Sequence, residues 1–142
     1  MDYLTRISIE HGQMYESLAI FKKAMEIDGE ENYTNIDKLS KFFNDLVIPH
    51  FQYEEGKLFP LMAEYGSLPE KQLTAELIKD HLKMLKAIDD ISGAIQSREV
   101  MAKYKMQGFS ALVKGTIKDL LEHAHKEDDS FYPNIKKYLL KQ

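Results

Sequence analysis

The chain has 142 residues, 44% of them apolar and 30% charged, a composition typical of a folded globular domain and not of a disordered or fibrous protein. It contains no cysteine, which excludes disulfide bonds, cysteine-ligated zinc or iron–sulfur clusters and a catalytic thiol. Because its formal net charge is −4, it lacks the excess of basic residues that nucleic-acid binding needs. We therefore expect a single domain over residues 1–142 that binds no nucleic acid.

Neither a membrane span nor a secretory signal is predicted. No stretch reaches the roughly 18 consecutive apolar residues of a membrane-spanning helix. The first residues, MDYLTRISIEHG, place acidic and polar side chains where a secretory signal would need an apolar run. We expect a cytoplasmic protein that does not associate with membranes.

Apolar residues recur at steps of three and four along four segments, which is the period of an amphipathic helix. These segments cover residues 4–25, 35–65, 73–95 and 109–131, with turns expected at 28–34, at Tyr65-Gly66 and between Arg98 and Lys105. Gly66 is a candidate helix C-cap, and Ser67–Glu70 forms a candidate start for the third helix. The pattern predicts an all-α fold, an up-down-up-down four-helix bundle with short loops.

Three prolines interrupt this pattern. Pro49 and Pro60 lie inside the second segment, where each removes a backbone donor, so we expect kinks there. Pro133 is expected to end the fourth helix or to bend it into a short C-terminal helix.

Each predicted helix carries one histidine on its apolar stripe. In an antiparallel pair of helices, two residues equidistant from the connecting turn lie at the same level. Positions 11 and 50 are equidistant from the first expected turn, 50 and 81 from the second, and 81 and 123 from the third. The spacing therefore predicts that four imidazoles share one layer of the bundle. These are His11, His50, His81 and His123.

Two glutamates are predicted to join this layer, because Glu54 and Glu127 each follow a histidine in an H-x-x-x-E motif, one turn along the same face. A carboxylate in an apolar core needs a compensating positive charge, and no Lys or Arg lies on the inward stripes. The two motifs also belong to an internal repeat, in which His50–Pro60 aligns without gaps to His123–Pro133 and Glu10-His11 to Asp80-His81. Two equivalent hairpins would thus build a pseudo-symmetric cation site from four His and two Glu.

Imidazole and carboxylate ligands without sulfur suit iron, manganese or zinc. Two glutamates shared by four histidines fit two metals better than one. With two imidazoles, two bridging carboxylate oxygens and an oxo or hydroxo bridge, each metal would have five ligands and one open octahedral position. An open position is typical of a reactive site and not of a closed structural one.

On these motifs the sequence, from about Ile7 to Pro133, resembles the hemerythrin-like (HHE cation-binding) domains. The resemblance implies a four-helix bundle with a non-haem di-iron centre, in which His11 and His50 bind one iron, His81 and His123 bind the other, and Glu54 and Glu127 bridge them. Members of this family bind dioxygen, react with nitric oxide or peroxide, sense iron or oxygen, or help to repair iron–sulfur clusters. The expected partner is therefore a small ligand such as O2, NO or peroxide, in oxygen or iron sensing or in stress handling.

The sequence departs from the oxygen-carrying members of this family. They have a fifth histidine one turn from the third-helix ligand, where this chain has Leu77 and Leu85. His125 lies two residues after His123 and is predicted to point to nearly the opposite helix face. Asp128 could replace Glu127 as the bridge, although the repeat favours Glu127. The ligand set is closer to the reactive and sensing members than to the reversible carriers, and the cysteine-containing segment typical of the cluster-repair type is not present.

Other residues near the motifs have weaker signals. Tyr15, Tyr53 and Tyr132 are expected to border the layer, and each could pack or donate a hydrogen bond to a bound oxygen species. The acidic residues Glu55, Asp128 and Asp129 are expected to be solvated, with contact to a metal-binding side chain as the alternative. The main alternative is a metal-free or zinc-bound helical interaction module. A ferritin-like bundle would need Glu-x-x-His twice, and a mononuclear zinc site would leave the paired glutamates unexplained.

Overall fold

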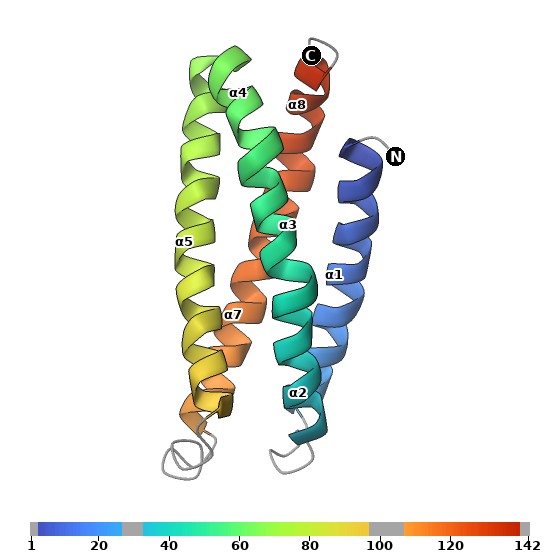
Figure 1. The fold of residues 1–142 in the computed structure, drawn as a ribbon, viewed down its shortest axis with the longest axis vertical. Coiled ribbons are helices and arrows are strands. Elements are labelled where there is room, and N and C mark those ends of the chain that lie inside the picture. Colours follow the sequence, from blue (N-terminus) through green and yellow to red (C-terminus); the bar gives the residue numbers. More distant parts are fainter. Residues whose placement is uncertain (1–2, 27–32, 97–106, 140–142) are drawn as a thin grey trace.

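A computed structural model describes residues 3–26, 33–96 and 107–139, so the turns expected at 28–34 and 98–105 lie wholly or mostly outside the described residues. Within these ranges the chain forms four long helical segments and no strand, which confirms the predicted all-α bundle (Figure 1). The first segment is α1 (Tyr3–Glu26) and the third is α5 (Leu68–Gln96). The second comprises α2 (Tyr33–Phe42), η2 (Phe43–Val47), α3 (Ile48–Tyr53), η3 (Glu54–Leu58) and α4 (Phe59–Tyr65); the fourth comprises α7 (Gln107–Lys126), η4 (Glu127–Phe131) and α8 (Tyr132–Leu139).

The four segments run up and down in sequence order. In Figure 1 the chain descends along α1, rises through α2, α3 and α4, descends along α5 and rises again through α7 and α8. Segment α7 packs against both α1 and α5, and α4 packs against both α5 and α8. No helix in the described ranges combines the length and apolar character that crossing a bilayer requires.

The sharp turn between α4 and α5 follows from its sequence. Gly66 ends α4 by donating its backbone N–H to the Met62 carbonyl at 2.8 Å, and a Cβ at this position would lie 2.5 Å from the same oxygen. Ser67 then starts α5 with a capping box: its N–H donates to Glu70 Oε1 at 2.8 Å, and the Glu70 N–H donates to Ser67 Oγ at 3.4 Å. The C-cap and the helix start predicted from the sequence are both present.

The three prolines that interrupt the helical pattern each follow a wide turn of helix. The turns η2, η3 and η4 are five-residue π-helical segments, and each ends two residues before a proline. In each case the N–H of the residue before the proline donates to the carbonyl five positions back. A wider turn accommodates a ring that would otherwise clash with the preceding turn. The helix therefore continues through Pro49, Pro60 and Pro133, and Pro133 is the second residue of the short helix α8.

The apolar core is divided into two clusters along the bundle axis. One cluster, toward the first and third turns, includes Leu18, Phe43 and Phe51; the other, toward the chain ends, includes Leu58 and Phe131. On every helix the residues of the predicted histidine layer fall between members of the two clusters. A polar layer is thus enclosed by apolar packing on both sides.

Candidate metal centre

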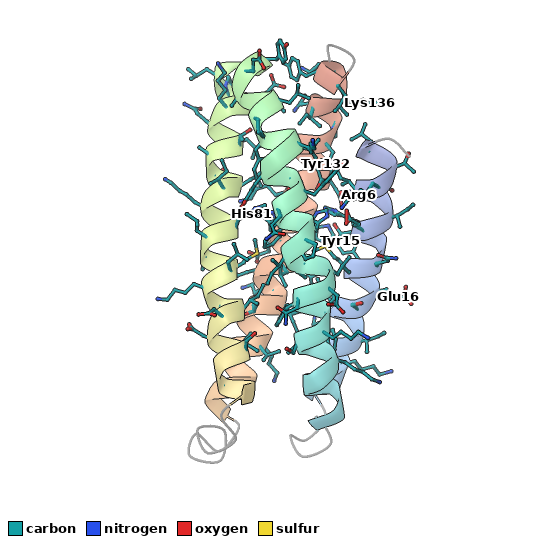
Figure 2. All side chains as sticks on the ribbon, viewed as in Figure 1. Arg6, Tyr15, Glu16, His81, Tyr132 and Lys136 are labelled. Carbon is teal, nitrogen blue, oxygen red and sulfur yellow. The ribbon has the colours of Figure 1, made fainter. Side chains whose placement is uncertain are left out.

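The structure brings the six residues of the predicted layer together near the middle of the bundle (Figure 2, where His81 is labelled). Each of the four histidines comes from a different helical segment, and the two glutamates are the first residues of the π turns η3 and η4. None of the six is more than 3% exposed. Their common level agrees with the distances counted from the three turns. The six are His11, His50, Glu54, His81, His123 and Glu127.

The facing atoms of these side chains form a closed ring. The Nε2 atoms of His11 and His50 lie 3.1 Å apart, and those of His81 and His123 lie 3.0 Å apart. Glu54 Oε1 lies 3.3 Å from Nε2 of both His50 and His81, which links the two pairs on one side. On the other side, Glu127 Oε1 lies 3.5 Å from His11 Nε2 and 3.4 Å from His123 Nε2. Each glutamate thus joins one histidine of each pair.

The ring is electrostatically incomplete without a cation. Glu54 Oε1 and both carboxylate oxygens of Glu127 are buried without a hydrogen-bond partner among the described residues. Burial, followed by the neighbouring Glu127 carboxylate, raises the pKa of Glu54 well above its ordinary value. Burial also favours a raised pKa for Glu127, but its contacts with Glu54, His11 and His123 outweigh burial and hold that pKa well below its ordinary value. Two carboxylates with orphaned oxygens in a dry site are costly unless a positive ion neutralises them.

Two histidines of the ring, His81 and His123, have pKa values shifted in opposite directions. Burial, and then repulsion from His123, lowers the pKa of His81 to about 4. An imidazole must be neutral to offer a lone pair to a metal. Burial also disfavours the charged form of His123, but contacts with Glu127 and Asp80 outweigh it and raise the His123 pKa.

A carboxylate lies against the outer nitrogen, Nδ1, of every histidine in the ring. The Nδ1 atoms of His11 and His81 lie 3.0 Å from Asp128 Oδ1 and Glu55 Oε1, respectively. When Nδ1–H donates outward, the lone pair on Nε2 is left to face the interior of the ring. The other two contacts are His50 Nδ1 to Glu10 Oε1 at 3.4 Å and His123 Nδ1 to Asp80 Oδ2 at 3.2 Å.

These contacts include two residues, Glu10 and Asp80, for which the sequence predicted no role. Glu55 and Asp128 are 43% and 37% exposed, and each also contacts a ring histidine of the other hairpin, which was the alternative to full solvation. Asp128 approaches the outer nitrogen of His11, not the interior of the ring, whereas Asp129 is exposed as expected. The repeat itself contained the signal, since it aligns Glu10 with Asp80 and Glu55 with Asp128.

Two tyrosines add polar contacts. The Tyr132 hydroxyl donates to Glu54 Oε2 at 2.7 Å, and the Tyr132 hydroxyl oxygen lies 3.0 Å from His11 Nε2. Tyr15 donates to Asp128 Oδ2 at 2.5 Å. A cleft of about 510 Å³ opens beside them, lined in part by His11, Gly12 and both tyrosine side chains. Open space therefore reaches the edge of His11 that faces away from the other histidines of the bundle interior.

The remaining candidates lie outside the ring. His125 is exposed, and its Nδ1 lies 3.4 Å from the hydroxyl of Tyr15. Tyr53 lies under the guanidinium of Arg6, at 3.9 Å from carbon to ring centroid. Leu77 is buried and Leu85 partly buried, and neither side chain has a donor atom for a metal.

The donor atoms divide into two groups that share a glutamate. One group combines Glu54, His81, His123 and Glu127, and the other combines His11, His50 and Glu127; within each group the candidate ligand atoms lie within 4.8 Å of one another. Buried nitrogen and carboxylate donors at this spacing could hold a metal ion. The residues present therefore fit the bound cation that the orphaned oxygens require.

Comparison with known proteins agrees with this geometry. The sequence model of the hemerythrin HHE cation-binding domain matches residues 3–135, nearly the whole chain. Searches of curated proteins and of solved structures returned no significant match. The family binds metal cations, and the matched region contains all six residues of the ring. The chain therefore belongs to the hemerythrin HHE cation-binding domain family.

Proposed function

We propose that this protein is a non-haem di-iron protein that binds or reacts with O2, NO or peroxide. His11 and His50 would hold one iron, His81 and His123 the other, and Glu54 and Glu127 would be shared between them. The observation that carries this proposal is the ring itself: four Nε2 atoms and three partnerless carboxylate oxygens face one buried space.

Membership of the hemerythrin family favours iron among the cations that this donor set fits. Nitrogen and carboxylate ligands without sulfur suit divalent iron, manganese or zinc, and the two shared glutamates favour a pair of ions. When bound, a pair of iron ions would supply electrons and an open coordination position for a small ligand. Leu77 and Leu85, one turn before and after His81, supply no further protein ligand.

The protein's own residues would control the surroundings of that chemistry. The four outer carboxylates orient the imidazoles, and the apolar clusters on both sides exclude bulk water from the ring. The Tyr132 hydroxyl, bound to Glu54 Oε2, is a hydrogen-bond donor close to the ring, and the cleft beside His11 gives access to small molecules. These features support a reactive or sensing site better than a closed structural one.

Metal content is the first test. Protein expressed with added iron should contain close to two iron atoms per chain, measured by elemental analysis. His50→Ala or Glu54→Ala should lose at least half of that iron because each removes a ligand, whereas the matched control His125→Ala should keep it. One zinc per chain, no metal, or full occupancy in His50→Ala would contradict the proposal, and the metal-free or zinc-bound interaction module would then be preferred.

A second experiment separates binding from reaction. The reduced, iron-loaded protein would be mixed with O2, NO or hydrogen peroxide, and its absorbance followed by stopped flow. If removing O2 restores the starting spectrum, the site binds O2 reversibly. Irreversible oxidation with continued peroxide consumption would indicate an enzyme or a sensor, which the missing fifth histidine leads us to expect. No spectral response to any of the three would contradict a small-ligand function.

A further inference from the structure

In two of the four outer carboxylates, a single oxygen contacts both a ring histidine and a basic side chain. In the first hairpin, Glu10 Oε1 lies 3.4 Å from His50 Nδ1 and 3.2 Å from Arg6 Nε. In the second, Asp80 Oδ2 lies 3.2 Å from His123 Nδ1 and 2.9 Å from Lys126 Nζ. A cation thus lies against the same carboxylate–histidine contact in both halves of the molecule.

The two cations occupy positions that are not equivalent in the repeat. When Glu10 is aligned with Asp80, Arg6 aligns with Glu76; when His50 is aligned with His123, Tyr53 aligns with Lys126. The two residues at these positions are in contact within each hairpin. In the first hairpin Arg6 lies over the Tyr53 ring at 3.9 Å, and in the second Lys126 Nζ lies 2.9 Å from Glu76 Oε1. The cation comes from α1 in one hairpin and from α7 in the other (Arg6 is labelled in Figure 2).

Such an exchange is not expected from repeated packing alone. Equivalent packing would place the same residue type at equivalent positions, yet here the cation changes helix and remains beside the carboxylate. Among the described residues, no Lys or Arg pairs with the other two outer carboxylates: Asp128 accepts a hydrogen bond from Tyr15, and Glu55 is 43% exposed. Each histidine pair therefore has one outer carboxylate with a cation and one without.

We propose that Arg6 and Lys126 are positioning residues that act through Glu10 and Asp80 to set equal charge around the two halves of the metal centre and to favour its reduced state. This inference rests on the proposed di-iron function. A hydrogen-bonded carboxylate increases the electron donation of an imidazole, and a cation on the same oxygen weakens that effect. Positive charge close to the centre also disfavours the more positive, oxidised metal pair.

The test is a potentiometric titration of iron-loaded protein, with dithionite supplying electrons through mediator dyes and absorbance reporting the oxidised fraction. Arg6→Gln and Lys126→Gln should each raise the ratio of oxidised to reduced centre at a fixed potential. The expected change is roughly threefold to tenfold, because both side chains are partly exposed and water and salt screen them. The two effects should be of similar size, and the double variant should show a larger change than either.

Matched controls separate charge from packing. Arg6→Lys and Lys126→Arg keep the charge and should stay close to the wild-type potential. Lys83→Gln removes the same charge from an exposed pair with Asp119, 3.5 Å away, and should leave the potential unchanged. Higher ionic strength should reduce the effect of Arg6→Gln if that effect is electrostatic.

The outcomes distinguish this inference from the proposed function. If all variants bind two irons but Arg6→Gln and Lys126→Gln match Lys83→Gln in potential, the inference is wrong and the di-iron proposal stands. If Arg6→Lys shifts the potential as much as Arg6→Gln does, packing over Tyr53 and not charge is responsible, which also overturns the inference. If wild-type protein takes up no iron, the proposed function fails, and the inference fails with it.

Discussion

The two halves of the ring have equivalent histidines and glutamates but different linings. On the His11 side Tyr132 packs against the imidazole, with ring centroids 5.1 Å apart, and its hydroxyl contacts both His11 and Glu54. The equivalent residue on the His81 side is Phe59, at 5.2 Å, which offers no hydroxyl. The difference indicates that repeated motifs build the ligand set, while the residues between the motifs make one side polar and the other apolar.

A second aromatic residue strengthens this contrast. Phe51 stacks on the His81 imidazole at 3.9 Å between ring centroids, whereas its counterpart in the repeat is Ala124. The cleft beside His11 measures about 510 Å³, and the pocket beside His123 only about 130 Å³. The larger open space thus lies beside His11, and the aromatic rings pack against His81.

The largest effect on stability should come from removing the aromatic side chain that stacks on His81. Phe51 is 1% exposed, and Phe51→Ala should lower the free energy of unfolding by about 3–5 kcal/mol, because it leaves a cavity and removes the ring stacked on His81. Urea unfolding of metal-free protein measures this loss. Phe51→Leu is the control that keeps most of the volume and should cost less. A change below about 1 kcal/mol for Phe51→Ala would mean that the Phe51 side chain does not stabilise this side of the core.

The two glutamates should differ when each is replaced by leucine in metal-free protein. Glu127→Leu should lower the free energy of unfolding at neutral pH by about 3 kcal/mol, since it removes a buried carboxylate whose contacts with His11 and His123 hold its pKa below the ordinary value. Glu54→Leu should cost less, because burial and the neighbouring Glu127 carboxylate disfavour the ionised form of Glu54. Both should abolish the increase in melting temperature that added iron gives the wild type. A gain in stability for Glu127→Leu would show that the cost of burying this carboxylate outweighs its contacts with the two histidines.

Tyr132→Phe removes the hydroxyl by which Tyr132 differs from its counterpart Phe59. We expect a loss of about 1–3 kcal/mol in metal-free protein, because the buried Glu54 Oε2 loses its hydroxyl donor. Urea unfolding measures the loss. Phe59→Leu alters the aromatic side chain at the equivalent position without removing a hydrogen bond, and serves as the packing control for Tyr132→Phe. Unchanged stability in Tyr132→Phe would show that the hydrogen bond contributes nothing net.

The smallest effect should come from a group far from the ring. Hydrogen bonds from the Tyr138 hydroxyl and the Ser67 backbone N–H lower the pKa of Glu70 to about 2. Because the folded-state pKa lies below the unfolded value, the ionised carboxylate stabilises the fold at neutral pH, and this contribution is lost as the pH falls from about 4.5 to about 2. Glu70→Gln should cost about 1 kcal/mol at pH 7 and progressively less over that range. A cost that does not change with pH would exclude the ionised carboxylate as its source, and iron content should stay at the wild-type level.

Periodicity predicted much of the fold and the ring, because both depend on which residues face inward and how far they lie from a turn. The four helices, the Gly66 C-cap and the common level of the histidines follow from such local rules. The π turns were not predicted: the prolines indicated a disturbance, but how a helix accommodates a proline depends on the packing around it. That the six residues bind iron stays a prediction.

The partners of the outer carboxylates were the part of the site that the sequence did not predict. Glu55 and Asp128 have the polarity and spacing of solvated residues, and their partners are histidines on the opposite hairpin. A contact between residues 117 positions apart, as for His11 and Asp128, depends on how two hairpins face each other and has no local sequence signal.

The sequence by itself determined the candidate ligand set, since each glutamate lies one turn after its histidine and the repeat supplies the second half. Only the tertiary structure decided which carboxylate meets which Nδ1, that Arg6 and Lys126 lie at corresponding contacts from different helices, and that the larger cleft lies beside His11 while aromatic rings pack against His81. The reason is physical: backbone periodicity fixes the face and the level of a side chain, whereas its partners across the bundle depend on how the helices pack.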